Sequence, residues 1–179
     1  VICHIPNILS LFKCIELCLK QDGYFIFEEP YLGSMFKKTS YDQIYDEHFY
    51  MFSASSIKSI LEKFNLKLVN AERIPTHGGS MRAYVCQNES VSIDNSVNEL
   101  LAEEEAYGLK KLTTYIDFGE KIQNLKKKVL DNLQKLKKKH KNIIGYGAPA
   151  KATTTLNFFN IRDEIDFIIE DNELKHEKY

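Results

Sequence analysis

The sequence predicts an α/β protein, because short apolar runs of strand length alternate with longer segments in which apolar residues recur at helical spacing. Residues 23–27 form an almost continuous apolar run, which is typical of a strand buried on both faces. Residues 142–147 and 165–169 form two further runs, and a helical segment separates them. These patterns favour two successive α/β units joined by a helical connector.

The N-terminal segment is predicted to run from strand to helix to strand. Residues 1–3 are typical of the end of a buried strand, and because no initiator Met precedes them we expect the chain to be a piece of a longer protein. Asp22 and Gly23 turn the chain into the strand at residues 23–27. A helix is predicted between the two strands from apolar side chains at helical spacing: Ile8, Leu11, Phe12, Ile15 and Leu19.

A second helix and a pair of strands are predicted after residue 52. Ser53 is a suitable N-cap for a helix with an apolar face. Strands are predicted at residues 66–73 and 81–86, and a glycine-containing turn at residues 75–80 joins them. Two strands joined by such a turn should pair antiparallel, here at the edge of an otherwise parallel sheet.

The character of the sequence changes in its second half. Residues 94–140 are rich in Glu and Lys and carry apolar residues at steps of three and four, which predicts an amphipathic helical connector. A strand, a helix over about residues 150–159 and another strand follow, and the chain ends after this one unit. We therefore divide the sequence into residues 1–90, residues 91–141 and a truncated domain at residues 142–179.

Composition excludes several classes of protein. The 179 residues are 44% hydrophobic and 27% charged, as in ordinary globular proteins, and 24 basic against 25 acidic side chains leave no field that would attract nucleic acid or a membrane. No apolar stretch approaches the roughly 20 residues of a membrane helix, so we expect a cytoplasmic protein. The four cysteines form no CxxC pair, which predicts free thiols and no metal in this chain.

Residues 41–53 concentrate groups suited to acid–base chemistry. An imidazole, three carboxylates and three phenols follow the predicted strand, at the edge where open α/β sheets bind their ligands. A neutral His48 can accept a proton, Tyr45 can donate to an oxyanion, and Glu47 can hold a hydroxyl or fix an imidazole tautomer. His4 follows the neighbouring predicted strand and would overlook the same crevice. If the loop were helical, Tyr41, Tyr45, His48 and Phe52 would share one face; the alternative is a surface loop with aromatic anchors.

Two further segments contain glycines that allow close approach of a ligand. His77 and Arg82 flank Gly78-Gly79-Ser80, although a plain hairpin turn explains this segment equally well. Gly145, Gly147 and Lys151 lie where a strand meets a helix, which suits phosphate or nucleotide binding, with a tight structural turn as the alternative.

In this order, the Glu47-His48 loop, the turn at residues 77–82 and the glycine turn at residues 145–151 resemble the sugar C-methyltransferases of deoxysugar biosynthesis. The resemblance covers essentially the whole chain. It implies the C-terminal part of a class I, Rossmann-like methyltransferase sheet, then the connector, then the start of a second Rossmann-like domain. It also implies methyl transfer from S-adenosylmethionine to a carbon next to the ketone of a nucleotide-linked 4-keto-deoxysugar.

The resemblance also implies roles for individual residues. His48 would remove the α-proton, Tyr45 and His4 would steady the enolate or orient the sugar, and Glu47 would hold the sugar or tune the imidazole. The glycine-rich loop that holds the cofactor in this fold and the zinc cysteines of the family's N-terminal module are not in this sequence. We therefore expect the isolated chain to bind S-adenosylmethionine poorly and to be inactive.

Two other functions remain open at this point. One is a non-catalytic nucleotide-sugar-binding or assembly module, in which residues 94–140 form an interface. The other is an oxidoreductase fragment built on the glycine turn at residues 145–147. Convergence of His4, Tyr45 and His48 in one cleft would favour the enzyme over the binding module.

Overall fold

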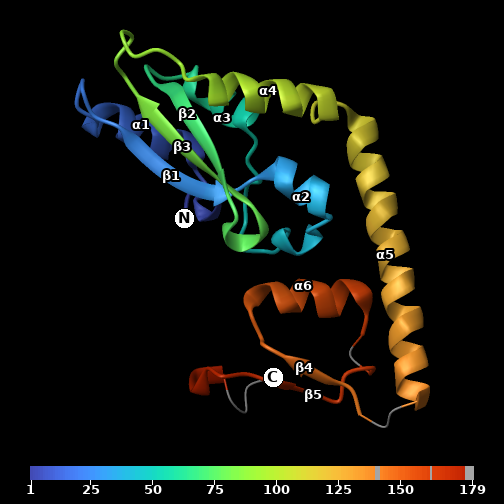
Figure 1. The fold of residues 1–179 in the computed structure, drawn as a ribbon. Coiled ribbons are helices and arrows are strands. Elements are labelled where there is room, and N and C mark those ends of the chain that lie inside the picture. Colours follow the sequence, from blue (N-terminus) through green and yellow to red (C-terminus); the bar gives the residue numbers. More distant parts are fainter. Residues whose placement is uncertain (140–141, 162, 176–179) are drawn as a thin grey trace. The chain divides into compact units, whose positions relative to one another are not determined.

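The computed structural model describes residues 1–139, 142–161 and 163–175 (Figure 1). The chain forms two compact units, the first made of Val1–Tyr41 and Asp46–Phe118, the second of Asp42–Tyr45 and Gly119–Tyr179. Both contain strands and helices, which confirms the α/β prediction. The division falls inside one long helix, so the boundaries at residues 90 and 141 remain a prediction.

The first unit is built on a three-stranded sheet. Its strands are β1 (Phe25–Pro30), β2 (Lys67–Ile74) and β3 (Ser80–Cys86), in the order β1-β3-β2. β3 is antiparallel to both neighbours, so β1 and β2 run in the same direction. The predicted antiparallel pairing of the last two strands is therefore confirmed, and β3 lies in the middle of the three.

β1 differs from its prediction because only one of its faces is covered. Tyr24, just before the strand, and Ile26 are each 51% exposed, whereas Phe27 is 8% and Glu29 only 2% exposed. The covered face therefore carries a carboxylate beside a phenylalanine. On the open face Glu28 forms an ion pair with Arg82 of β3. A continuous apolar run in the sequence indicates a strand, but it does not indicate whether other elements cover one face of that strand or both.

The start of the chain is a short 3₁₀ helix, η1 (Ile2–His4), and not the predicted strand. The helix α1 (Ile8–Cys18) follows, and the Asn7 side chain accepts a hydrogen bond from the Ser10 backbone N–H. Helix α3 (Ala54–Leu61) begins as predicted at Ser53, with a reciprocal capping box to Ser56. One helix was not predicted, α2 (Leu32–Lys38), directly after β1.

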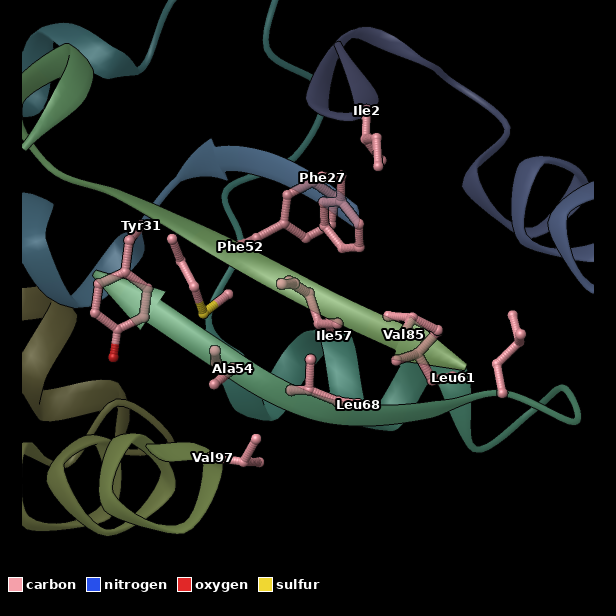
Figure 2. Close-up of a cluster of buried hydrophobic side chains, with 14 of the residues drawn as sticks. Ile2, Phe27, Tyr31, Phe52, Ala54, Ile57, Leu61, Leu68, Val85 and Val97 are labelled. Atoms are coloured by element: carbon pink, nitrogen blue, oxygen red, sulfur yellow. The ribbon is translucent and has the colours of Figure 1, made fainter. Parts of the chain in front are cut away.

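The hydrophobic core of the first unit lies between the covered face of the sheet and the helices (Figure 2). Phe12 of α1 and Ile57 of α3 are completely buried, and Val85 of β3 lies with them. Figure 2 also shows Ile2 of η1 beside Phe27, so the first residues of the chain belong to this core. Burial of apolar side chains of this size contributes about 1.5–3 kcal/mol each.

Two helices follow β3 in the sequence: α4 (Asn95–Tyr107) and α5 (Leu112–Lys139). Glu104 of α4 is 4% exposed and accepts hydrogen bonds from the hydroxyl of Tyr31 and from the backbone N–H groups of Ala54 and Ser55. The carboxylate therefore caps the N-terminus of α3 from another helix, where the helix dipole favours negative charge. Burial and the neighbouring Glu104 raise the pKa of Tyr31.

The second unit contains one β-α-β arrangement, as predicted. Strands β4 (Ile144–Tyr146) and β5 (Phe167–Ile169) are parallel, and α6 (Ala150–Phe159) connects them. A short 3₁₀ helix, η4 (Glu173–Lys175), follows β5. The residues of β5 are all exposed, so the two strands bury little apolar surface of their own.

Within the described ranges 1–139, 142–161 and 163–175, each helix is either too short or too polar to cross a lipid bilayer.

Gly79→Ala is expected to lower the free energy of unfolding by about 2 kcal/mol, because Gly79 has φ = +127° and an added Cβ would lie 2.6 Å from Cβ of Ser34. Gly119→Ala in α5 is the matched control. Its Cβ would meet nothing within 4 Å, so the helix propensity of Ala should stabilise the protein by about 0.5–1 kcal/mol. Urea denaturation of both variants measures the difference; equal effects would show that the turn accommodates a side chain.

Candidate active site

The loop at residues 41–53 is irregular instead of helical. It contains one short 3₁₀ helix, η2 (Tyr41–Gln43), and then bends and extended backbone. The predicted helical face is therefore not formed. The later part of the loop is fixed to the first unit by a parallel bridge between Phe52 and Tyr31 and by a hydrogen bond of 2.5 Å from the Tyr50 hydroxyl to the Pro6 carbonyl.

His4 and His48 lie together in the first unit, although 43 residues separate them in the chain. Their ring centroids are 4.9 Å apart and the rings meet edge to face. Oε2 of Glu47 lies 3.9 Å from Nδ1 of His4. Since the His4 side chain is 39% exposed, the group is open to solvent on one side. The predicted convergence of His4, Tyr45 and His48 in one cleft stays a prediction.

A backbone hydrogen bond connects the two chain segments that carry the histidines. The N–H of Phe49 donates to the carbonyl of Cys3 at 2.8 Å. His48 directly precedes the donor residue and His4 directly follows the acceptor residue, so one backbone contact places both imidazoles.

Cys3 also lies in this cluster. Ligand atoms of Cys3, His4 and His48 are all within 4.8 Å of one another, a spacing that a metal ion could occupy. However, burial and contact with Glu29 raise the pKa of the Cys3 thiol to about 12, and a metal ligand must be the thiolate. Three ligands are also fewer than the four of a structural zinc site. The absence of a metal from this chain therefore stays a prediction.

Tyr45 belongs to the short segment Asp42–Tyr45, which groups with the second unit. Its predicted role beside the histidines remains a prediction.

The structure places Arg82 and His77 in the hairpin of β2 and β3. The guanidinium of Arg82 bonds Glu28 of β1 and Glu72 of β2, its cross-strand neighbours. His77 has φ = +50° within the 3₁₀ turn η3 (Thr76–Gly78), and the turn is fixed by Lys38, which donates to the carbonyl of Gly78 at 2.6 Å. The guanidinium of Arg82 therefore has structural partners on both neighbouring strands.

The turn at Gly145 and Gly147 already binds a carboxylate of the protein itself, that of Glu170. The N–H of Ala148 donates to Oε2 of Glu170 at 2.6 Å, and this bond is the largest cause of the lowered pKa of Glu170. Lys175 lies 3.6 Å from the same carboxylate oxygen. Glu170 thus occupies the turn that precedes α6, where a phosphate would bind.

A groove of the first unit lies elsewhere. It has a volume of about 460 Å³ between α3 and α4, and none of the predicted site residues lines it. Its lining is a mixture of Ser, Lys, Glu, Leu and Ala side chains, including Glu104.

Comparison with known proteins decides the family. A profile of the C-methyltransferase C-terminal domain matches residues 75–179, which is more than half of the chain. The chain belongs to the C-methyltransferase family. A profile of a methyltransferase domain matches residues 1–71 as well. The chain is 29% identical over 177 residues to the C-methyltransferase NovU of Streptomyces niveus, covering 98% of this chain and 42% of that relative.

The predicted resemblance is therefore confirmed at the level of the C-methyltransferase family. The chain spans less than half the length of NovU. The match to the methyltransferase domain covers His4, Glu47 and His48, whereas the match to the C-terminal domain covers Arg82 and the glycine turn at residues 145–151.

One residue that contacts the site in this C-methyltransferase chain was not predicted. Glu29 is buried in β1 and its carboxylate reaches η1. The sequence offered one signal for it: the acidic pair Glu28-Glu29 ends an apolar strand, where alternation must turn one of the two carboxylates toward the core.

Proposed function

We propose that the protein containing this chain is an S-adenosylmethionine-dependent C-methyltransferase that acts on a nucleotide-linked 4-keto-deoxysugar. The observation that carries the proposal is the pairing of His4 and His48 at 4.9 Å, with the Glu47 carboxylate beside His4. Membership of the C-methyltransferase family and the similarity to NovU support the reaction class.

The chemistry requires a carbon nucleophile, so a proton next to the ketone must leave first. His48 takes this proton, the C–H bond breaks and its electron pair forms the enolate. His4 and Tyr45 steady the enolate oxygen or orient the sugar, and Glu47 holds a sugar hydroxyl or fixes the tautomer of His4. S-adenosylmethionine supplies, when bound, a methyl group on a sulfonium that carries its own leaving group.

A pair of imidazoles suits this division of labour. A histidine near its ordinary pKa is an effective base close to neutral pH, and a second imidazole within reach can donate a hydrogen bond to the developing oxyanion. A carboxylate beside one of the two rings distinguishes them, because it favours an N–H on the nitrogen that faces it. In this chain that ring is His4, which leaves His48 as the base.

We assign Arg82, His77, Gly145, Gly147 and Lys151 to binding of the nucleotide-linked sugar, with the glycine turn as the weaker contact. Because Glu170 already accepts from Ala148, a nucleotide phosphate must compete with a carboxylate there. The proposal includes a cytoplasmic protein with no partner among nucleic acids or membranes, consistent with the nearly balanced charge of the chain. No zinc is assigned to this chain.

The alternative of a non-catalytic nucleotide-sugar-binding or assembly module is less well supported. It gives no reason for two imidazoles and a carboxylate to converge at the C-terminal side of β1. The oxidoreductase alternative is weaker still, since Glu170 bonds the turn itself and is not directed outward to a ribose.

The proposal is tested with the full-length protein, S-adenosylmethionine and a nucleotide-linked 4-keto-deoxysugar in deuterated buffer. Mass spectrometry should show a methyl group on the sugar and, without the cofactor, deuterium at the carbon next to the ketone. Methyl transfer to oxygen or nitrogen instead of carbon would exclude the proposed reaction.

Nucleotide diphosphate is expected to bind the glycine turn weakly, and Glu170→Gln should strengthen binding by about fivefold by removing the competing negative charge. Lys151→Ala should weaken it, because a cation near the helix N-terminus is lost. Calorimetric titration of the full-length protein measures both effects, with the exposed Glu173 changed to Gln as the matched control. No response to either Glu170→Gln or Lys151→Ala would return the turn to a structural role.

A further inference from the structure

Glu29 is a carboxylate inside the core of the first unit. It is 2% exposed, on the same face of β1 as Phe27, while its neighbour Glu28 points to solvent and pairs with Arg82. Because burying a carboxylate costs free energy unless donors surround it, its partners identify what it does.

Those partners are the backbone of η1. Oε1 of Glu29 accepts from the N–H of Ile2 at 2.5 Å. The thiol of Cys3 lies against the same carboxylate, which after burial is the next cause of its raised pKa. One buried side chain thus contacts two consecutive residues, and the next residue is His4.

The contacts of Glu29 continue to the loop. η1 presents the carbonyl of Cys3 to the N–H of Phe49, and this bond places His48 beside His4. β1, η1 and the loop therefore form one chain of contacts from Glu29 to both imidazoles. Oε2 of Glu29 is buried and meets no hydrogen-bond donor among the described residues apart from the weak approach of the Cys3 thiol.

We propose that Glu29 is the positioning residue of the His4–His48 pair: its carboxylate fixes η1 through the Ile2 N–H, and η1 in turn holds the loop that carries His48. The inference rests on the proposed function, since it presumes that these imidazoles take part in the reaction. Glu29 does not touch the substrate.

A side chain with an oxygen acceptor at position 29 can bind the buried N–H of Ile2, which an apolar side chain cannot do. Leu or Met would fill the space but would leave the N–H of Ile2 buried without a partner, which destabilises η1. Gln keeps a carbonyl oxygen for that N–H and removes only the charge. The pair of substitutions therefore separates the hydrogen bond from the electrostatic effect.

The test compares three variants of the full-length protein. Glu29→Leu removes the acceptor of the Ile2 N–H, Glu29→Gln keeps an oxygen acceptor at this position, and Phe27→Leu perturbs the same face of β1 without removing this hydrogen bond. The readouts are Tm, kcat and KM, and the NMR resonances of the His4 and His48 imidazoles.

Glu29→Leu is expected to lower kcat about tenfold with KM within about twofold, because the Ile2 N–H loses its acceptor and alignment of the reacting groups is lost while substrate contacts remain. It should also shift the NMR resonances of both the His4 and the His48 imidazole. Glu29→Gln should restore most of kcat and bring the resonances back close to those of the wild-type protein, because its carbonyl oxygen accepts from the same N–H.

Phe27→Leu should lower Tm and leave kcat and the imidazole resonances nearly unchanged. If Glu29→Leu behaves like Phe27→Leu, or if Glu29→Gln does not restore kcat, Glu29 is a structural residue only and the proposal is overturned. The imidazole resonances require no turnover, so they remain informative if the reaction proves to be different. Shifted resonances with unchanged catalysis in Glu29→Leu would uphold the placement of Glu29 and contradict the role of His48 as the base.

Discussion

His48→Asn in the full-length protein is expected to reduce kcat by about 10²–10⁴-fold, the usual loss when a positioned base is removed. Asn retains a hydrogen-bonding side chain of similar size but cannot take a proton near neutral pH. Affinity for S-adenosylmethionine should stay nearly unchanged, because the proposal places the base beside the sugar. Steady-state kinetics and calorimetric titration of the cofactor measure the two quantities on the same preparation.

Exchange of the substrate's α-proton separates this step from methyl transfer. In the wild-type protein the proton should exchange with solvent deuterium, and in His48→Asn the exchange should fall in parallel with kcat. Exchange that continues at the wild-type rate in the variant would assign the base to another residue, with Tyr45 and His4 the next candidates.

Glu104→Ala is expected to lower the free energy of unfolding by about 3 kcal/mol, the largest effect on stability that we predict. The change leaves the Tyr31 hydroxyl and the N–H groups of Ala54 and Ser55 without their acceptor, and it removes the negative charge from the N-terminus of α3. Urea denaturation, followed by circular dichroism, measures the loss.

Glu105→Ala is the matched control for this experiment. Glu105 is the next residue of α4 and is exposed, so its loss should change the free energy of unfolding by at most about 0.5 kcal/mol. Similar losses in the two variants would show that water replaces the carboxylate of Glu104 in the groove that it lines.

The elements that the sequence predicted well are those whose pattern is local. The apolar spacing from Ile8 to Leu19 and the cap at Ser53 depend on neighbours within four residues, and α1 and α3 form where they were expected. The start of the chain failed for the opposite reason. Two buried residues in succession, Ile2 and Cys3, suit a strand or a 3₁₀ turn, and the acceptor that decides between them, Glu29, lies 27 positions away.

The proximity of His4 and His48 could be predicted from the sequence, whereas the partner of Glu47 could not. A histidine after each of two consecutive elements indicated a shared edge of the fold, and His4 and His48 do lie together. The partner of Glu47 could not be predicted, because an irregular backbone has no fixed side-chain period. Glu47 is adjacent to His48 in the chain but faces His4.

The backbone hydrogen bond from Phe49 to Cys3 has a consequence for how such a site tolerates change. Neither side chain takes part in the bond, so replacements at positions 3 and 49 can alter packing without separating the two imidazoles. The number of residues between β1 and Phe49 cannot vary in the same way: one residue added to or removed from this stretch would offer the Cys3 carbonyl a different N–H and rotate His48 away from His4. Substitutions at these two positions are therefore compatible with this geometry, whereas insertions and deletions in the loop are not.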